Sequence, residues 1–230
     1  RGVSSSYIET NVLYKGARTF RKDHLEVAKE HGFVRLPVII ADGQYGEDYS
    51  NIRINFKHFE EAYIAKGYEE FNQFVICSHF KGHSEAGFGG AIKQLSMGFA
   101  ARAGKMAQHS NNVPIVNEDK CTACVACKDH CPADAIEVEE FAIIDPSLCI
   151  GCAACIGHCH FGAMNPDWGA NAGFLEKVAE YATAAAIGKS NIYISFVINI
   201  TEECDCYGIQ MKPVVEDIGI LASTDPVALD

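Results

Sequence analysis

Hydrophobic and polar positions along the chain alternate between the spacing of strands and the spacing of helices. Apolar runs that predict strands occupy residues 3–9, 36–41, 74–77 and 192–200. Stretches whose apolar residues recur at helical spacing occupy residues 22–31, 91–97 and 172–187. Gly32 directly follows the first of these stretches and supplies a helix stop. Strands that alternate with helices are typical of an α/β domain.

A different kind of sequence interrupts this alternation and carries an internal repeat. The two halves of the repeat are CTACVACKDHCP at residues 121–132 and CIGCAACIGHCH at residues 149–160. Three cysteines at intervals of three wrap a loop whose thiolates converge on one iron–sulfur cluster, and the fourth cysteine reaches the other cluster. Zinc also takes four thiolates, but its sites usually join two CxxC pairs across a longer loop. The repeat therefore predicts two [4Fe–4S] clusters.

This repeat resembles the two-cluster bacterial ferredoxins over about fifty residues, including Pro132 and the strand-like text AIEV and AMNP after each half. His160 stands where that family usually has a second proline. The resemblance implies that one cluster is bound by Cys121, Cys124, Cys127 and Cys159. It implies that the other is bound by Cys131, Cys149, Cys152 and Cys155. We therefore expect an α/β domain at residues 1–115 and 167–230, interrupted by a small ferredoxin-like α+β insert at residues 116–166.

Composition and charge narrow the choice of partners. The 230 residues carry a formal net charge of -11, which argues against nucleic acid as a partner. Two oxidised clusters would take this charge to about -15 and favour a redox partner with a basic docking face. Eleven cysteines, an odd number, fit a metal protein of a reducing compartment, so we expect a cytoplasmic protein. No apolar run is long enough for a membrane span.

Two polar stretches of the α/β part are candidate sites. In SHFKGH, the alternating His79, Lys81 and His83 would project from one face if the preceding strand continues. The alternative is a solvated strand end. In GFGG and the helix after it, backbone N–H groups and Lys93 would face an anion. The alternative is a tight turn. The sequence matches neither GxGxxG nor the Walker loop, the two glycine-rich motifs that bind nucleotides.

A third candidate is EECDC, where Cys204 and Cys206 stand among acids. The acids should raise the pKa of these thiols, which disfavours a catalytic thiol, and a disulfide between residues two apart would be strained. A bound cation reverses this argument, because it deprotonates thiols and attracts carboxylates. In an extended segment the two thiols would also point the same way and could contact one ligand. The alternative is a pair of apolar cysteines in a turn. We therefore predict contact with an additional metal, a cofactor or a substrate near Cys204 and Cys206.

The chain as a whole resembles the iron–sulfur proteins of the domain-of-unknown-function 362 family. The stretches that carry the resemblance are HLEVAKEHGF, SHFKGHSEAGFGGAIKQLSMG, the two cysteine runs, EECDC and DIGILASTDPVALD. The resemblance implies an α/β domain with a ferredoxin-like insert, in chains that usually start earlier and continue further. Since this chain begins at Arg1 and ends in what resembles the start of a helix, we expect both ends to be truncated.

The hypothesis that follows is an electron-transfer protein or oxidoreductase, in which the insert passes single electrons to a site for a small molecule at the strand ends of the α/β domain. The residues of this predicted site are His79, Lys81, His83, Lys93, Cys204 and Cys206. One alternative is a pure electron carrier whose α/β part docks partners. Another is a metal-delivery or maturation factor.

Overall fold

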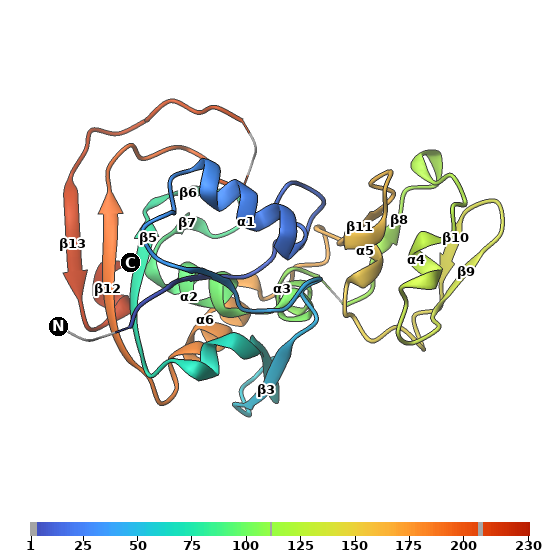
Figure 1. The fold of residues 1–230 in the computed structure, drawn as a ribbon, viewed down its shortest axis with the longest axis horizontal. Helices are drawn as coiled ribbons and strands as arrows, with labels where there is room; N and C mark the ends of the chain where they lie inside the picture. Colours follow the sequence, from blue (N-terminus) through green and yellow to red (C-terminus); the bar gives the residue numbers. More distant parts are fainter. Residues whose placement is uncertain (1–3, 111, 207–208) are drawn as a thin grey trace. The chain divides into compact units, whose positions relative to one another are not determined.

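The computed structural model describes residues 4–110, 112–206 and 209–230. Within them, helices alternate with short strands that pair into several small sheets, which confirms the predicted α/β class (Figure 1). The chain divides into two compact units. Unit 1 contains the residues up to Asn51 together with 63–68 and 100–172, and unit 2 contains 52–62, 69–99 and 173–230. The predicted insert falls within the residues of unit 1, and its boundaries stay a prediction.

Unit 1 begins with a strand, a helix and a second strand parallel to the first. These are β1 (Tyr7–Glu9), α1 (Arg21–Glu30) and β2 (Val38–Ile40). After α1, Gly32 has a φ of +86°, and the N–H of Phe33 donates to the carbonyl of Ala28 at 3.0 Å. This closes the helix by a left-handed turn that glycine adopts without strain, so the predicted helix stop is confirmed. Val3, where the first strand was expected to begin, lies outside the described residues.

Helix α3 (Arg102–His109) is buried along nearly its whole length in unit 1, and the hydrophobic pattern did not predict it. Its only apolar side chains at helical spacing are Ala103, Met106 and Ala107, too short a pattern to indicate a helix by itself. Lys105 is buried because its ammonium donates to Thr10 Oγ1, Asn11 O and Ala100 O at 2.5, 2.7 and 2.9 Å. The strands β3 (Tyr49–Arg53) and β4 (Glu61–Ala65) form a two-stranded sheet that was also not predicted, and η1 (Lys66–Glu70) follows β4.

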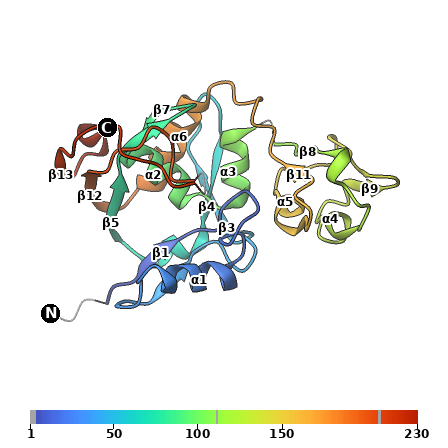
Figure 2. The ribbon, with the colours of Figure 1, turned by 90° about the horizontal axis from the view of Figure 1, so that it is seen from above.

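The cysteine repeat of unit 1 folds into two small antiparallel strand pairs and two short helices. The elements are β8 (Ile115–Val116), η2 (Glu118–Lys120), α4 (Ala126–Asp129), β9 (Ile136–Val138), β10 (Ala142–Ile144), α5 (Ala154–His158) and β11 (Met164–Asn165). Strand β8 pairs with β11 and β9 pairs with β10, while α4 and α5 lie side by side (Figures 1 and 2). Ile136, Ile156 and Met164 are almost fully buried here and pack around the cysteines. The repeated sequence therefore forms repeated structure.

Unit 2 contains a three-stranded sheet in which β12 (Ser190–Val197) is central (Figure 2). It pairs in parallel with β5 (Gln73–His79) and antiparallel with β13 (Gly219–Ser223). The predicted strands at 74–77 and 192–200 correspond to β5 and β12. Strand β12 ends earlier than expected because Asn199 has a φ of 49° and its N–H donates to Asp217 Oδ1 at 2.6 Å.

Two helices and a hairpin complete unit 2. Their bounds are β6 (Lys81–His83), β7 (Gly87–Gly89), α2 (Ala91–Phe99), α6 (Phe174–Ala186) and η3 (Pro226–Leu229). Helix α2 packs against α6 and against β5, and β6 pairs with β7. The predicted helices at 91–97 and 172–187 therefore correspond to α2 and α6. Among the residues that the structure describes, no helix is long and apolar enough to cross a membrane.

Candidate functional sites

Two cavities in unit 1 are each lined by four cysteines, and each has a volume of about 330 Å³ including space open to solvent. The cysteines of one cavity are Cys121, Cys124, Cys127 and Cys159. Those of the other are Cys131, Cys149, Cys152 and Cys155. These are the two interleaved sets that the ferredoxin resemblance implied, and their thiols are free. Four thiols around one cavity are the donor set that a [4Fe–4S] cluster takes.

The loops that carry the first three cysteines of each half repeat an unusual backbone conformation. Ala123 and Val125 have φ values of 51° and 57°, and the equivalent Gly151 and Ala153 have φ values of 69° and 58°. A β-branched residue such as Val125 rarely adopts positive φ, and such strain clusters at functional sites. Alternation of right- and left-handed residues turns successive N–H groups toward a common anion, as in many iron–sulfur sites. Both loops therefore share the kind of backbone conformation that is found around bound anions.

The fourth cysteine of each half also accepts a backbone hydrogen bond. Ala135 N–H donates to Cys131 Sγ at 3.3 Å, and Ala163 N–H donates to Cys159 Sγ at 3.1 Å. Hydrogen bonds to sulfur favour the thiolate and tune the potential of a bound cluster. Burial raises the pKa of Cys155, so a cation must displace its proton before the sulfur can act as a ligand. In the described part of the chain, no group of side chains is placed to hold a single metal ion.

Arg102 at the start of α3 lies beside the second set of cysteines, and sequence reasoning did not single it out. A Cβ at Gly157 of α5 would lie 2.1 Å from Arg102 Nη1, so this glycine permits the close approach. Arg102 Nη2 donates to Thr19 O, while Nε and Nη1 make no hydrogen bond to any described residue. Its charge interacts with Cys152 and Cys155. The structure therefore places a buried cation near one of the two cavities.

A pair of histidines connects the two halves of the repeat. His130 and His158 each precede the fourth cysteine of their half, and their rings stack with centroids 3.6 Å apart and planes at 15°. Burial, together with the neighbouring His130, lowers the pKa of His158 to about 4. An uncharged ring at this position avoids repulsion between stacked imidazoles. Sequence reasoning missed this pair, although its equivalent position in both halves was a visible signal.

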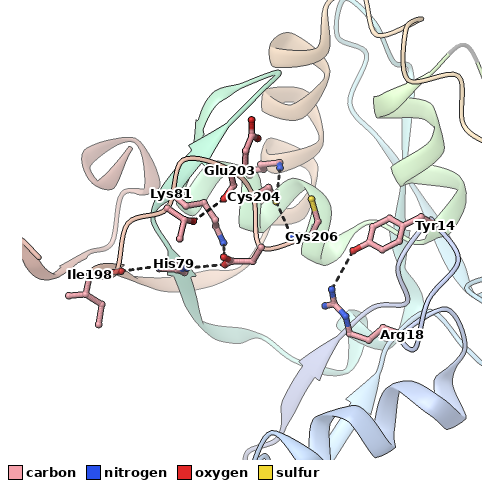
Figure 3. A network of polar contacts seen from close by, with 11 residues as sticks. Tyr14, Arg18, His79, Lys81, Ile198, Glu203, Cys204 and Cys206 are labelled. Carbon is pink, nitrogen blue, oxygen red and sulfur yellow. Dashed lines mark hydrogen bonds and ion pairs between the residues drawn. The ribbon is translucent and has the colours of Figure 1, made fainter. Parts of the chain in front are cut away.

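In unit 2, the structure brings His79 and Lys81 to the loop that carries EECDC (Figure 3). Asp205 Oδ2 lies 2.9 Å from His79 Nδ1 and 2.5 Å from Lys81 Nζ. His79 Nε2 lies 2.9 Å from the carbonyl of Ile198, so both ring nitrogens face acceptors. Burial raises the pKa of Asp205, but Lys81 and His79 outweigh this effect and lower it.

Cys204 is surrounded by hydrogen-bond donors. Lys93 Nζ lies 3.7 Å from Cys204 Sγ, and the N–H of Cys206 donates to the same sulfur at 3.4 Å (Figure 3). The Cys206 thiol lowers the pKa of Cys204, burial opposes this, and His83 and Lys93 lower it further. The net result is a lowered pKa for Cys204 and a raised pKa for Cys206.

This arrangement corrects two expectations about EECDC. The acids were expected to raise the pKa of both thiols; that of Cys206 is raised, by Cys204 and burial, whereas that of Cys204 is lowered. Asp205 is paired with Lys81, and Glu203 accepts the N–H of Ser84 at 3.2 Å. Their charges are therefore directed at other partners. The segment was also expected to be extended, whereas Asp205 and Cys206 lie in a turn. The Cys206 N–H bends back to Cys204 Sγ and forms this turn.

Close backbone approach and a carboxylate at the start of α2 shape the surroundings of the loop. A Cβ at Gly82 would lie 1.9 Å from the carbonyl oxygen of Glu202, so only glycine fits where β6 meets the loop. The N–H groups of Ala91 and Ile92 at the start of α2 donate to Asp230 at 2.6 and 2.8 Å. The anion that GFGG and its helix were expected to face is thus a carboxylate of the chain itself. Sequence reasoning did not identify Asp230, because no local pattern links it to α2.

All six residues predicted for the α/β site therefore lie in unit 2, joined through contacts of Asp205 and Cys204. Cys77, the remaining cysteine, lies on β5 opposite Ile194 of β12 and is exposed. Tyr207, the last residue of the stretch EECDCY, lies outside the described residues.

Fold and sites together define an α/β protein with two cavities of four thiols and a separate cluster of thiols and cations. The chain belongs to the family described as Domain of unknown function (DUF362), whose model matches residues 6–230. This confirms the family that the sequence resembled, while the iron–sulfur nature and the ferredoxin-like insert stay predictions. No curated protein and no solved structure shows a significant match to the chain.

Proposed function

We propose that the chain is an iron–sulfur electron-transfer protein that binds two [4Fe–4S] clusters and passes single electrons between them and a redox or ligand site in unit 2. The observation that carries the proposal is that each cavity is lined by one complete set of four cysteines, drawn from both halves of the repeat. When bound, such a cluster gains or loses one electron at a time.

The chain's own residues have separate roles in this proposal. The eight cysteines are the ligands, and the left-handed loops direct N–H groups toward each cluster. Apolar side chains such as Ile136, Val138 and Met164 line the cavities and limit the access of water. Zinc would use the same thiols, but three cysteines at equal intervals with a fourth from the other half support clusters.

Serine variants of one cysteine from each set test the proposal. After anaerobic reconstitution, the wild-type chain should contain about eight iron and eight sulfide ions. Cys124→Ser and Cys152→Ser should each reduce the iron content by about half, since each removes a ligand of one cluster only. Cys77→Ser is the matched control and should lose none. About two zinc ions with no acid-labile sulfide would refute the proposal.

The grouping of His79, Lys81, Lys93 and Cys204 in unit 2 supports a ligand site in addition to electron transport. A variant with both His79→Ala and Lys81→Ala separates this function from that of a pure carrier. A pure carrier should keep its rate of reduction by a reductase and its rate of electron delivery to an acceptor. We expect instead that the double variant is still reduced by the reductase but no longer delivers electrons to the acceptor. The acidic net charge of -11 favours a basic docking face on that reductase.

A further inference from the structure

The two thiols of the 202–206 loop have different surroundings, although they are only two residues apart. Cys204 is half-buried, and its sulfur faces Lys93 Nζ at 3.7 Å and the N–H of Cys206 at 3.4 Å. Cys206 is exposed, and its thiol hydrogen-bonds to the sulfur of Cys204. Such an arrangement stabilises a thiolate at Cys204 and keeps the proton on Cys206.

The hydrogen bonds of His83 show which role its ring has beside Cys204. His83 Nδ1 accepts the N–H groups of Glu85 and Ala86, each at 3.1 Å. An accepting Nδ1 leaves the proton of the neutral ring on Nε2, which is then a donor. The ring is held in place by stacking on Phe174, with centroids 6.1 Å apart. His83 is therefore arranged to donate to a thiolate, and its Nε2 is not arranged to bind a metal.

Two of the three acids of the loop, Glu203 and Asp205, contact other parts of unit 2. Asp205 is bound by His79 and Lys81, and the Glu203 carboxylate accepts the N–H of Ser84. Lys81 and Lys93 add positive charge from β6 and α2. The charges that face Cys204 directly are thus cationic or neutral donors, which is the environment of a reactive cysteine.

We propose that Cys204 and Cys206 are a dithiol that reduces a low-molecular-weight disulfide, with Cys204 as the attacking nucleophile and Cys206 as the resolving thiol. The Cys204 thiolate attacks one sulfur of the substrate, a mixed disulfide forms, and the other sulfur leaves as a thiolate. Cys206 loses its proton to that leaving group and attacks Cys204 Sγ, which releases the second sulfur as a thiolate. The substrate gains two electrons and one proton from the pair, the second thiolate takes its proton from water, and the pair becomes a disulfide.

The backbone of the loop permits this disulfide. In an extended strand, Cα atoms two residues apart are separated by about 6.6 Å, and the turn at Asp205 and Cys206 shortens this separation. Disulfides span Cα separations of about 4.4 to 6.8 Å. The return to the thiolate at Cys204 and the thiol at Cys206 needs two electrons and one proton. This return rests on the proposed function, because it would take one electron from each of the two clusters.

Exposure of the iron-loaded chain to glutathione disulfide tests the inference. After an acid quench, alkylation of free thiols and digestion, peptide masses identify which cysteine has reacted. In the wild-type chain, the peptide with Cys204 and Cys206 should lose two hydrogens and resist alkylation. In Cys206→Ser, a glutathione adduct should accumulate on Cys204. In Cys204→Ser, reaction at Cys206 should be at least about tenfold slower, since the Lys93 ammonium and the N–H of Cys206 face the sulfur at position 204. Cys77→Ser is the control and should behave as wild type.

Two results would overturn the inference. One is that Cys206 in Cys204→Ser reacts as fast as Cys204 does in Cys206→Ser. The other is that wild-type Cys204 keeps the glutathione adduct and no internal disulfide forms. Iron and sulfide are measured on the same samples, so that a failure of the proposed iron–sulfur function can be told apart from a failure of the dithiol proposal. A chain without clusters that still forms the disulfide contradicts the proposed function alone, and a chain with both clusters that forms none contradicts the dithiol alone.

Discussion

Replacement of Lys93 by methionine isolates the contribution of one charge to the reactivity of Cys204. Methionine keeps the length of the side chain and its packing on α2 while it removes the ammonium 3.7 Å from the sulfur. Two opposite charges about 4 Å apart attract by about 1 kcal/mol in water and by about 4 kcal/mol near a protein surface. Since one pKa unit corresponds to about 1.4 kcal/mol, the pKa of Cys204 should rise by roughly one to three units.

The assay is the rate at which iodoacetamide alkylates Cys204 as a function of pH, followed by peptide mass. The midpoint of this profile should move upward in Lys93→Met and return toward wild type in Lys93→Arg, which restores the charge. Lys57→Met is the control, because the Lys57 ammonium is bound to Glu176 at 2.7 Å. A midpoint in Lys93→Met that shifts no further than in the control would refute the reasoning.

Three further predictions concern Gly82 and Asp205 in unit 2 and Arg102 in unit 1. Gly82→Ala should lower the free energy of unfolding, measured in urea, by about 1–3 kcal/mol, because the new Cβ would lie 1.9 Å from the Glu202 carbonyl oxygen. Gly16→Ala is the control: its Cβ would enter open space, so the free energy of unfolding should stay unchanged. Asp205→Asn should cost up to about 1 kcal/mol near neutral pH. The folded pKa of Asp205 is lowered, so this contribution is present above the unfolded pKa near 3.9, and the difference from wild type should vanish as pH falls through the folded value. Arg102→Met should lower the reduction potential of the cluster assigned to the Cys152 set by on the order of 60 mV in an EPR redox titration, with Arg102→Lys close to wild type.

Strong periodic patterns and regular cysteine spacing were the features of the sequence that predicted structure well. The helices α1, α2 and α6 and the strands β5 and β12 follow from local apolar patterns, and the two sets of cysteines follow from the repeat. Helix α3 was missed because its polar residues Arg102, Lys105 and Gln108 are buried, and no local pattern shows the tertiary hydrogen bonds of Arg102 and Lys105.

Sequence patterns identified the residues of the candidate site in unit 2 but not the charges that surround Cys204. Polar residues at strand ends identified His79, Lys81 and His83. The charge of the neighbouring acids gave the wrong direction for the pKa of Cys204, because the partners of Asp205 and Glu203 come from β5, β6 and the turn after it. A thiol's pKa depends on which charges face it in space, and sequence neighbours are only part of that set.

Anaerobic analysis of iron, zinc and acid-labile sulfide, combined with EPR of the reduced chain, tests the central claim most directly. The account predicts about eight iron and eight sulfide ions per chain and an EPR signal from two reduced [4Fe–4S] clusters. A chain that binds about two zinc ions, contains no sulfide and gives no EPR signal after reduction would contradict it.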